Sequence, residues 1–212
     1  MWTEEELVLY DGLHGKDRYL LAILGEVFDV TKGLNHYGVD KSYHFFTGKD
    51  GTRAFVTGEF NKNGLIADVT GLSVQDMVGI EDWLLFYRKD YVAVGKLIGH
   101  YYDEQGNPKP SLLAAQEQIQ KGHAQQDYEK QLQQKFPGCN SRWGQAEGKT
   151  LWCSDKSGGI DRSWTGVLRI YKDPTLSDPE RCVCVRQDLL DDPHLFLYDG
   201  CSPTASECHW KS

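Results

Sequence analysis

The chain has 212 residues, a formal net charge of −8 and a pI near 5.3. With 40% hydrophobic and 25% charged residues, it has the composition of a folded protein of one or two domains and not of a disordered chain. The acidic balance and the lack of a Lys/Arg cluster argue against a surface for nucleic acid. No apolar run reaches the roughly 20 residues that a membrane-spanning helix needs, so we expect no span.

The first hundred residues predict a mixture of short strands and helices. The run RYLLAILGEVFDVT (residues 18–31) predicts two strands, 19–24 and 27–30, joined by a tight turn at Gly25-Glu26. Short helices are predicted for residues 42–47 and 52–58. Apolar residues at helical spacing predict a longer helix over residues 72–90, with Ser73 as N-cap and Asp76 three positions on. A strand at 91–99 closes this region.

The composition changes after His100. The segment DEQGNPKP (residues 103–110) predicts a linker between a first domain, residues 1–102, and a second region, residues 111–212. A polar, Gln-rich helix is predicted for residues 111–136, ended by Pro137-Gly138. Its apolar positions are sparse and predict one thin packed stripe: Leu112, Leu113, Ile119, Tyr128, Leu132 and Phe136. Beyond it, short strands are predicted at 150–153, 167–171, 181–186 and 195–198.

All six cysteines lie in the last third of the chain: Cys139, Cys153, Cys182, Cys184, Cys201 and Cys208. An even number confined to one segment predicts a disulfide framework and an oxidising compartment. The competing interpretation is a metal site built from Cys182, Cys184, Cys208 and His209, but no paired C-x-x-C spacing supports it. In a strand, Cys182 and Cys184 share one face, so each can reach a different partner.

Residues 35–60 form the stretch most typical of a ligand pocket. Tyr37 and Tyr43 stand six positions apart among glycines and four phenylalanines, in a segment with turn chemistry. A tyrosine in an apolar setting is more often a core residue with its hydroxyl bonded to a partner. The segment around this pair decides between the two interpretations.

The sequence from residue 26 resembles the cytochrome b5-like fold, and more closely the membrane-associated progesterone receptor branch of that superfamily. The resemblance is carried by EVFDVTKG (residues 26–33), HYGVDKSYHFFTGKDGTRAF (36–55), the helix with Trp83 and YVAVGKLIG (91–99). It implies an α+β fold, in which a cytochrome b5-like haem-binding domain is followed by a helix and a small disulfide-stapled, β-rich C-terminal region.

The resemblance also implies the haem ligands. Ordinary cytochromes b5 hold haem between two histidines, the first in a His-Pro-Gly-Gly turn, whereas this chain has His36-Tyr37-Gly38 and no second histidine in residues 52–66. By resemblance, Tyr43 is the axial tyrosinate of a ferric haem b. Tyr37 and Tyr91 are pocket tyrosines that bond around the iron or the propionates. Lys89 pairs with a propionate, although Asp90 stands where the family has the lysine.

Ligand chemistry agrees with this assignment. A phenol has a pKa near 10, but coordination to iron favours its anion, and tyrosine is a known haem ligand. His36 and His44 are the rival ligands. The predicted apolar walls are Phe45, Phe46, Phe28, Leu34, Phe55 and Trp83, and for Phe45 and Trp83 a core role fits the sequence equally well.

The resemblance therefore implies a secreted or ER-lumenal haem-binding protein without catalysis of its own, a signalling factor that promotes neuronal differentiation and neurogenesis. Met1-Trp2 is followed directly by Thr3-Glu4-Glu5-Glu6, which is no signal-peptide pattern, so we expect any signal segment to precede this sequence. The open face of a five-coordinate haem suits a steroid or lipid, or a second protomer in a haem-mediated dimer. The alternatives are a b5-type electron-transfer haemoprotein, which needs two strong axial ligands, and an apo scaffold whose disulfide-bonded tail binds a cell-surface receptor. No hydrolase or nucleotide-binding pattern is present.

Overall fold

The computed structural model describes residues 1–211, which divide into two compact units. The first unit ends at Ala124 and the second begins at Gln125. Helix α5 (Pro110–Lys135) is continuous through this point, so it contributes residues to each unit. In the described part of the chain, no helix is both long and apolar enough to cross a bilayer.

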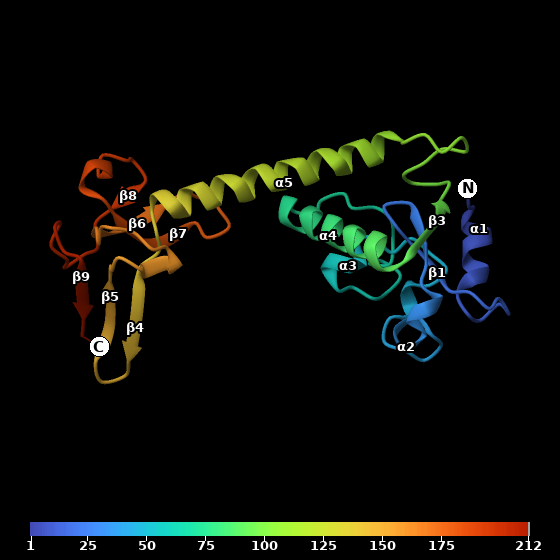
Figure 1. The fold of residues 1–212 in the computed structure, drawn as a ribbon, viewed down its shortest axis with the longest axis horizontal. Helices are drawn as coiled ribbons and strands as arrows, with labels where there is room; N and C mark the ends of the chain where they lie inside the picture. The colour runs from blue at the N-terminus through green and yellow to red at the C-terminus, as the bar shows by residue number, and fades with distance from the viewer. Residues whose placement is uncertain (212) are drawn as a thin grey trace. The chain divides into compact units, whose positions relative to one another are not determined.

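The sheet of the first unit has three antiparallel strands in the order β1 (Leu20–Ile23), β2 (Glu26–Asp29) and β3 (Val92–Lys96). Figure 1 labels β1 and β3 of this sheet. The β1–β2 hairpin turns through Leu24 and Gly25, whose φ angles are 47° and 74°. Two residues with positive φ match the twist of a tight hairpin. Both predicted strands are confirmed, with the turn one residue earlier than expected.

Helices surround this sheet. The longest one confined to the first unit, α4 (Val74–Asp90), begins as predicted: the Asp76 backbone NH donates to Ser73 Oγ at 3.1 Å, and the Ser73 NH donates back to the Asp76 carboxylate at 3.0 Å. The other helical elements are α1 (Glu4–Leu7), η1 (Val8–Tyr10), η2 (Thr31–Gly33), α2 (Leu34–Tyr37), η3 (His44–Phe46) and α3 (Ala54–Thr57). The last two occupy the segments 42–47 and 52–58 where short helices are predicted.

A buried polar cluster ties the hairpin to the segment that leads into α3. The Gly25 NH donates to an Asp50 carboxylate oxygen at 2.9 Å, and the Leu24 NH donates to Thr52 Oγ1 at 2.7 Å. Asp50 and Thr52 are both buried. Because an unpaired buried polar group is costly, these bonds fix the path of residues 50–54 beside the sheet.

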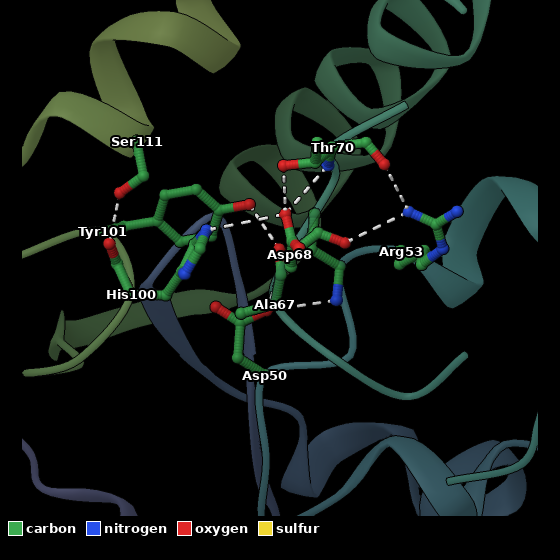
Figure 2. A network of polar contacts seen from close by, with 9 residues as sticks. Asp50, Arg53, Ala67, Asp68, Thr70, His100, Tyr101 and Ser111 are labelled. Carbon is green, nitrogen blue, oxygen red and sulfur yellow. Dashed lines mark hydrogen bonds and ion pairs between the residues drawn. The ribbon is translucent and has the colours of Figure 1, made fainter. Parts of the chain in front are cut away.

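A second polar network fixes the loop before α4, and Figure 2 shows it from close by. The Tyr101 hydroxyl donates to the Ala67 carbonyl, and Arg53 donates to the Thr70 carbonyl at 3.0 Å. The Ser111 hydroxyl donates to the His100 carbonyl, which joins the first turn of α5 to the segment after β3. The loop and the start of α5 are therefore held on the same unit as the sheet.

The first part of α5 completes the core of the first unit. Leu112, Ala115 and Ile119 are buried in the same cluster as side chains of β1, β2 and α4. Leu132 and Phe136 instead join the core of the second unit with Tyr171, Val183 and Val185. The single stripe expected on this helix is wrong: Leu113 and Tyr128 are exposed, and the apolar positions serve two cores.

The second unit contains two three-stranded antiparallel sheets, in the strand orders β4-β5-β9 and β7-β6-β8. The strands are β4 (Asn140–Gly144), β5 (Gly148–Trp152), β6 (Val167–Lys172), β7 (Glu180–Val185), β8 (Leu195–Phe196) and β9 (Glu207–Trp210), with short turns η4 (Ser157–Gly159) and η5 (Gln187–Leu189) between them. Four of these strands are predicted from the sequence, and β4 and β9 are not.

The three disulfides are Cys139–Cys182, Cys153–Cys184 and Cys201–Cys208. They include all six cysteines, so the disulfide prediction is confirmed and the alternative of a thiolate metal site is wrong. Cys182 and Cys184 lie two apart on β7 and reach different partners, as their spacing predicts.

The expected linker at 103–110 is an ordered loop in this structure. Asp103 Oδ1 accepts from the backbone NH groups of Gln105 and Asn107, at 2.9 and 2.8 Å, and the Lys109 NH donates to the Tyr101 carbonyl at 2.8 Å. The compact first unit runs on to Ala124. Whether residues 1–102 fold alone therefore stays a prediction, and the packing of α5 bears directly on it.

A chain ended at residue 102 loses the contacts of Leu112 and Ile119 with the core. Burial of each such side chain stabilises by about 1.5–3 kcal/mol, so we expect residues 1–102 to unfold at a lower temperature than residues 1–124. Thermal melts followed by circular dichroism compare the two, with the full chain as reference. Equal melting temperatures for 1–102 and 1–124 would show that α5 adds nothing to this core.

Candidate haem site

The segment from α2 to η3 places two tyrosines on opposite sides of one turn. Tyr37 ends α2 and is buried, whereas Tyr43 precedes η3 and has 46% of its surface exposed. The Tyr43 NH donates to the His36 carbonyl at 3.0 Å, which closes the turn. A glycine is required at position 38, because a Cβ there would lie 2.6 Å from the Leu34 carbonyl oxygen.

Tyr37 belongs to a cluster of three phenols, of which Tyr37 and Tyr87 are buried and Tyr91 is half-buried. Its hydroxyl is hydrogen-bonded to the hydroxyl of Tyr87 on α4. The rings of Tyr87 and Tyr91 stack with centroids 5.2 Å apart, and the Tyr37 ring lies edge-on to Tyr91 at 6.0 Å. Gly33 allows this approach, because a Cβ at that position would lie 2.9 Å from the Tyr91 hydroxyl.

Burial raises the pKa of both Tyr37 and Tyr87 well above the usual value for a phenol. Both hydroxyls therefore stay protonated at neutral pH and serve as hydrogen-bonding groups. The two residues are only 5% and 1% exposed, so the hydrogen bond between their hydroxyls lies away from solvent.

Tyr43 lies at the edge of a pocket of about 180 Å³, with its ring centroid 6.3 Å from that of Tyr37. The pocket is mostly aromatic, and its lining residues are Tyr37, Tyr43, Phe46, Ala54, Phe55, Gly58, Phe60, Trp83 and Tyr87. Sites that enclose a small molecule usually hold about 300–1,000 Å³. A group as large as a porphyrin therefore extends beyond this pocket.

Stacked phenylalanines build the wall beside Tyr43. Phe46 stacks on Phe55 with centroids 4.2 Å apart, and Phe45 stacks on Phe60 at 4.3 Å. Phe60 and Trp83 are 50% and 41% exposed, so an apolar rim surrounds the mouth of the pocket. The sequence predicts Phe46, Phe55 and Trp83 as apolar walls of a haem pocket, and all three line this pocket.

Other nominated residues lie outside the lining. Phe45 is half-buried behind Phe60, and Tyr91 belongs to the phenol cluster beneath the pocket. Phe28 is fully buried in the core, and Leu34 is exposed on α2. Lys89 is exposed on the last turn of α4.

Four lining residues are not predicted from the sequence: the small residues Ala54 and Gly58, and the aromatic residues Tyr87 and Phe60. Tyr87 fits the apolar spacing of α4, so the pattern assigns it to the core, although its position four residues before Tyr91 places both on one face. Phe60 closes the aromatic stretch at 35–60, but nothing in the sequence separates it from a surface phenylalanine.

The two rival histidines differ in their surroundings. His44 Nδ1 lies 3.1 Å from the Tyr37 carbonyl and is engaged within the turn. His36 is exposed, with its ring centroid 6.3 Å from that of Tyr43. No histidine is among the described residues that line the pocket.

The donor set fits haem with a phenolate ligand. Tyr43 offers an accessible hard oxygen donor, the stacked phenylalanines offer apolar walls, and two neutral phenols, Tyr37 and Tyr87, line the same pocket. A second strong axial donor is not found among the described lining residues.

Comparison with known proteins places this geometry in a class. Residues 3–100 match the family model "Cytochrome b5-like Heme/Steroid binding domain", so the first unit is a cytochrome b5-like domain. Neuferricin of Danio rerio is 45% identical over 97% of this chain and 78% of its own length, and neuferricin of Homo sapiens is 40% identical over 98% and 85%. "Membrane-associated progesterone-binding protein 4" of Arabidopsis thaliana is 41% identical over 98% and 83%. The chain belongs to the neuferricin family of the membrane-associated progesterone receptor branch.

The buried Tyr37–Tyr87 bond generates a stability prediction. Tyr37→Phe leaves the Tyr87 hydroxyl buried without its partner, so the free energy of unfolding should fall by about 1–3 kcal/mol. Removing both hydroxyls should cost less than the sum of the single changes, because the pair is coupled. Tyr43→Phe, at an exposed position, is the matched control and should leave the stability unchanged. Urea denaturation measures the parent, Tyr37→Phe, Tyr87→Phe, the double variant and the control, and strictly additive losses would contradict the coupling.

Proposed function

We propose that the first unit binds ferric haem, with the Tyr43 phenolate as axial ligand. The observation that carries this proposal is the position of Tyr43: it is the half-exposed phenol at the mouth of an aromatic pocket whose other two tyrosines are buried and neutral. A hard phenolate favours Fe(III) over Fe(II). Haem b is the form that the family resemblance implies.

The tyrosines beneath the pocket and nearby lysines would orient the group. Tyr37 and Tyr91 supply hydroxyls for the iron side or the propionates. Lys89 is the cation expected for a propionate, and Lys32 is a second candidate because its Nζ lies 5.0 Å from the centroid of the Tyr91 ring. Both lysines are exposed, so each ion pair would add about 1 kcal/mol or less.

An electron-carrier role receives less support. Such a carrier needs two strong axial ligands, so that little reorganises when the iron is reduced. A phenolate on one side, with no second donor among the described lining residues, favours a binding role over electron transfer. The apolar rim of Phe60 and Trp83 suits a steroid, another lipid or a second haem-loaded copy docked on the open face.

The proposal extends to where and how the protein acts. Three disulfides favour an oxidising compartment, so we propose a secreted or lumenal protein. We propose a non-catalytic signalling factor that promotes neuronal differentiation, because neuferricins are among the relatives that match nearly all of this chain and the family resemblance implies that role. Its partner would then be a cell-surface receptor.

Tyr43→Phe tests the ligand directly. The substitution keeps the ring and removes only the hydroxyl, so the fold should persist. Haem affinity should fall by a factor of about 100 or more, because loss of a residue that merely hydrogen-bonds to a metal ligand already lowers metal affinity by about 10- to 100-fold. Haemin titrations followed by absorbance measure the affinity. The parent protein should show high-spin ferric bands that resist dithionite.

The histidine variants are the controls for this experiment. His36→Ala and His44→Ala should each keep the high-spin spectrum. Loss of binding in either one, together with an unchanged Tyr43→Phe protein, would make a histidine the ligand. A sharp low-spin spectrum after reduction of the parent protein would favour the electron carrier.

A further inference from the structure

The second unit holds a cavity that exposes one of its disulfides. The cavity measures about 470 Å³, within the range of small-molecule sites. Cys139 and Cys182, which are bonded to each other, both line it, and both are half-buried. A solvent-filled cavity against a disulfide gives an incoming thiol access to its sulfurs.

The neighbouring bridge is protected. Cys184 is fully buried and Cys153 is 6% exposed, and neither lines the cavity. The third bridge, Cys201–Cys208, also lies outside the cavity lining. Cys201 is half-buried as well, so what distinguishes Cys139–Cys182 from the other two bridges is its position on the lining of this cavity.

Charged side chains also line this cavity, and their charge favours some incoming thiols over others. Lys149 and Arg181 line it, and Arg181 immediately precedes Cys182 in the chain. Arg181 Nη1 donates to the Phe136 carbonyl at 3.2 Å, while its Nη2 is buried without an acceptor. Asp178 is the one acidic residue on the lining. Two cations against one acidic residue on the lining favour a ligand that carries carboxylates.

The two inner bridges meet at the base of one hairpin. Cys139 directly precedes β4 and Cys153 directly follows β5, whose ends pair through Asn140 and Trp152. Their partners, Cys182 and Cys184, lie on one face of β7. As a result, the sulfurs of Cys139, Cys153 and Cys184 all lie within 4.8 Å of one another.

We propose that Cys139–Cys182 is an exchange site for small anionic thiols and that it passes the exchange on to Cys153–Cys184. The thiolate of the incoming molecule attacks Cys182 Sγ, a mixed disulfide forms, and the Cys139–Cys182 bond breaks. Cys139 leaves as a thiolate. No oxidant is consumed, because one disulfide replaces another.

The second step follows from the position of the released sulfur. The Cys139 thiolate lies within 4.8 Å of both sulfurs of the buried bridge. Its attack forms a Cys139–Cys153 or a Cys139–Cys184 bond and releases the other sulfur of the buried bridge as a thiolate. The buried bridge thus becomes exchangeable without direct access from solvent.

Three thiols of different charge test the proposal on the full chain. Glutathione carries carboxylates, 2-mercaptoethanol is neutral and cysteamine carries an ammonium group. Differential alkylation followed by peptide mapping gives the opening rate of each bridge per thiolate. Cys139–Cys182 should open first with all three thiols, fastest with glutathione, and added salt should reduce the difference.

Exposed charges around the cavity provide matched variants. Lys149→Gln should slow opening by glutathione about two- to five-fold, and Asp178→Asn should accelerate it by a similar factor. Lys156→Gln removes an exposed lysine outside the cavity lining and should change nothing. None of the three residues is buried, so the fold should persist in each variant.

The outcomes are decisive in both directions. If Cys139–Cys182 opens no faster than Cys201–Cys208, or if its rate ignores the charge of the thiol and of residues 149 and 178, the exchange site is refuted. Peptides that contain Cys139–Cys153 or Cys139–Cys184 bonds support the transfer step. Their absence, while Cys139–Cys182 is open, refutes that step.

Discussion

The candidate haem site depends on one buried hydrogen bond, between the hydroxyls of Tyr37 and Tyr87. One phenol comes from the end of α2 and the other from α4, so the bond holds these two helices together. Each hydroxyl is buried and each satisfies the other, which makes the arrangement costly to disturb. Because Tyr37 points inward, the turn that follows it leaves Tyr43 at the surface of the same aromatic cluster.

This arrangement assigns different chemistry to phenols that lie close together. Burial raises the pKa of Tyr37 and Tyr87, so they remain neutral donors and acceptors. Tyr43 keeps contact with solvent and is free to approach a metal from the pocket mouth. Burial therefore separates the supporting tyrosines, Tyr37 and Tyr87, from the candidate ligand Tyr43. Gly33 and Gly38 permit the close packing on which this separation rests.

The sequence predicts those elements whose signals are local. The capping residues of α4 and the β1–β2 hairpin follow from neighbouring residues, and the structure agrees with both. The strands β4 and β9 are missed because their residues are mostly polar or exposed, so no alternation marks them. The partner of Tyr37 is missed for another reason: a tyrosine at an apolar helix position has the same pattern whether it packs or bonds. Disulfide pairing depends on which strands meet, which six cysteines alone do not determine.

The second unit shows how a small region compensates for a thin core. Two of its bridges join the base of the β4–β5 hairpin, and hence the β4-β5-β9 sheet, to β7 of the other sheet. They close loops with sequence separations of 43 and 31 residues, for which chain entropy gives roughly 3–4 kcal/mol each. The loops overlap, so their effects are not additive. The same arrangement explains why the sulfurs lie close together. Two bridges join the base of one hairpin to positions 182 and 184 of β7, which stabilises the contact between the two sheets. It also places the sulfur of Cys139 within 4.8 Å of those of Cys153 and Cys184.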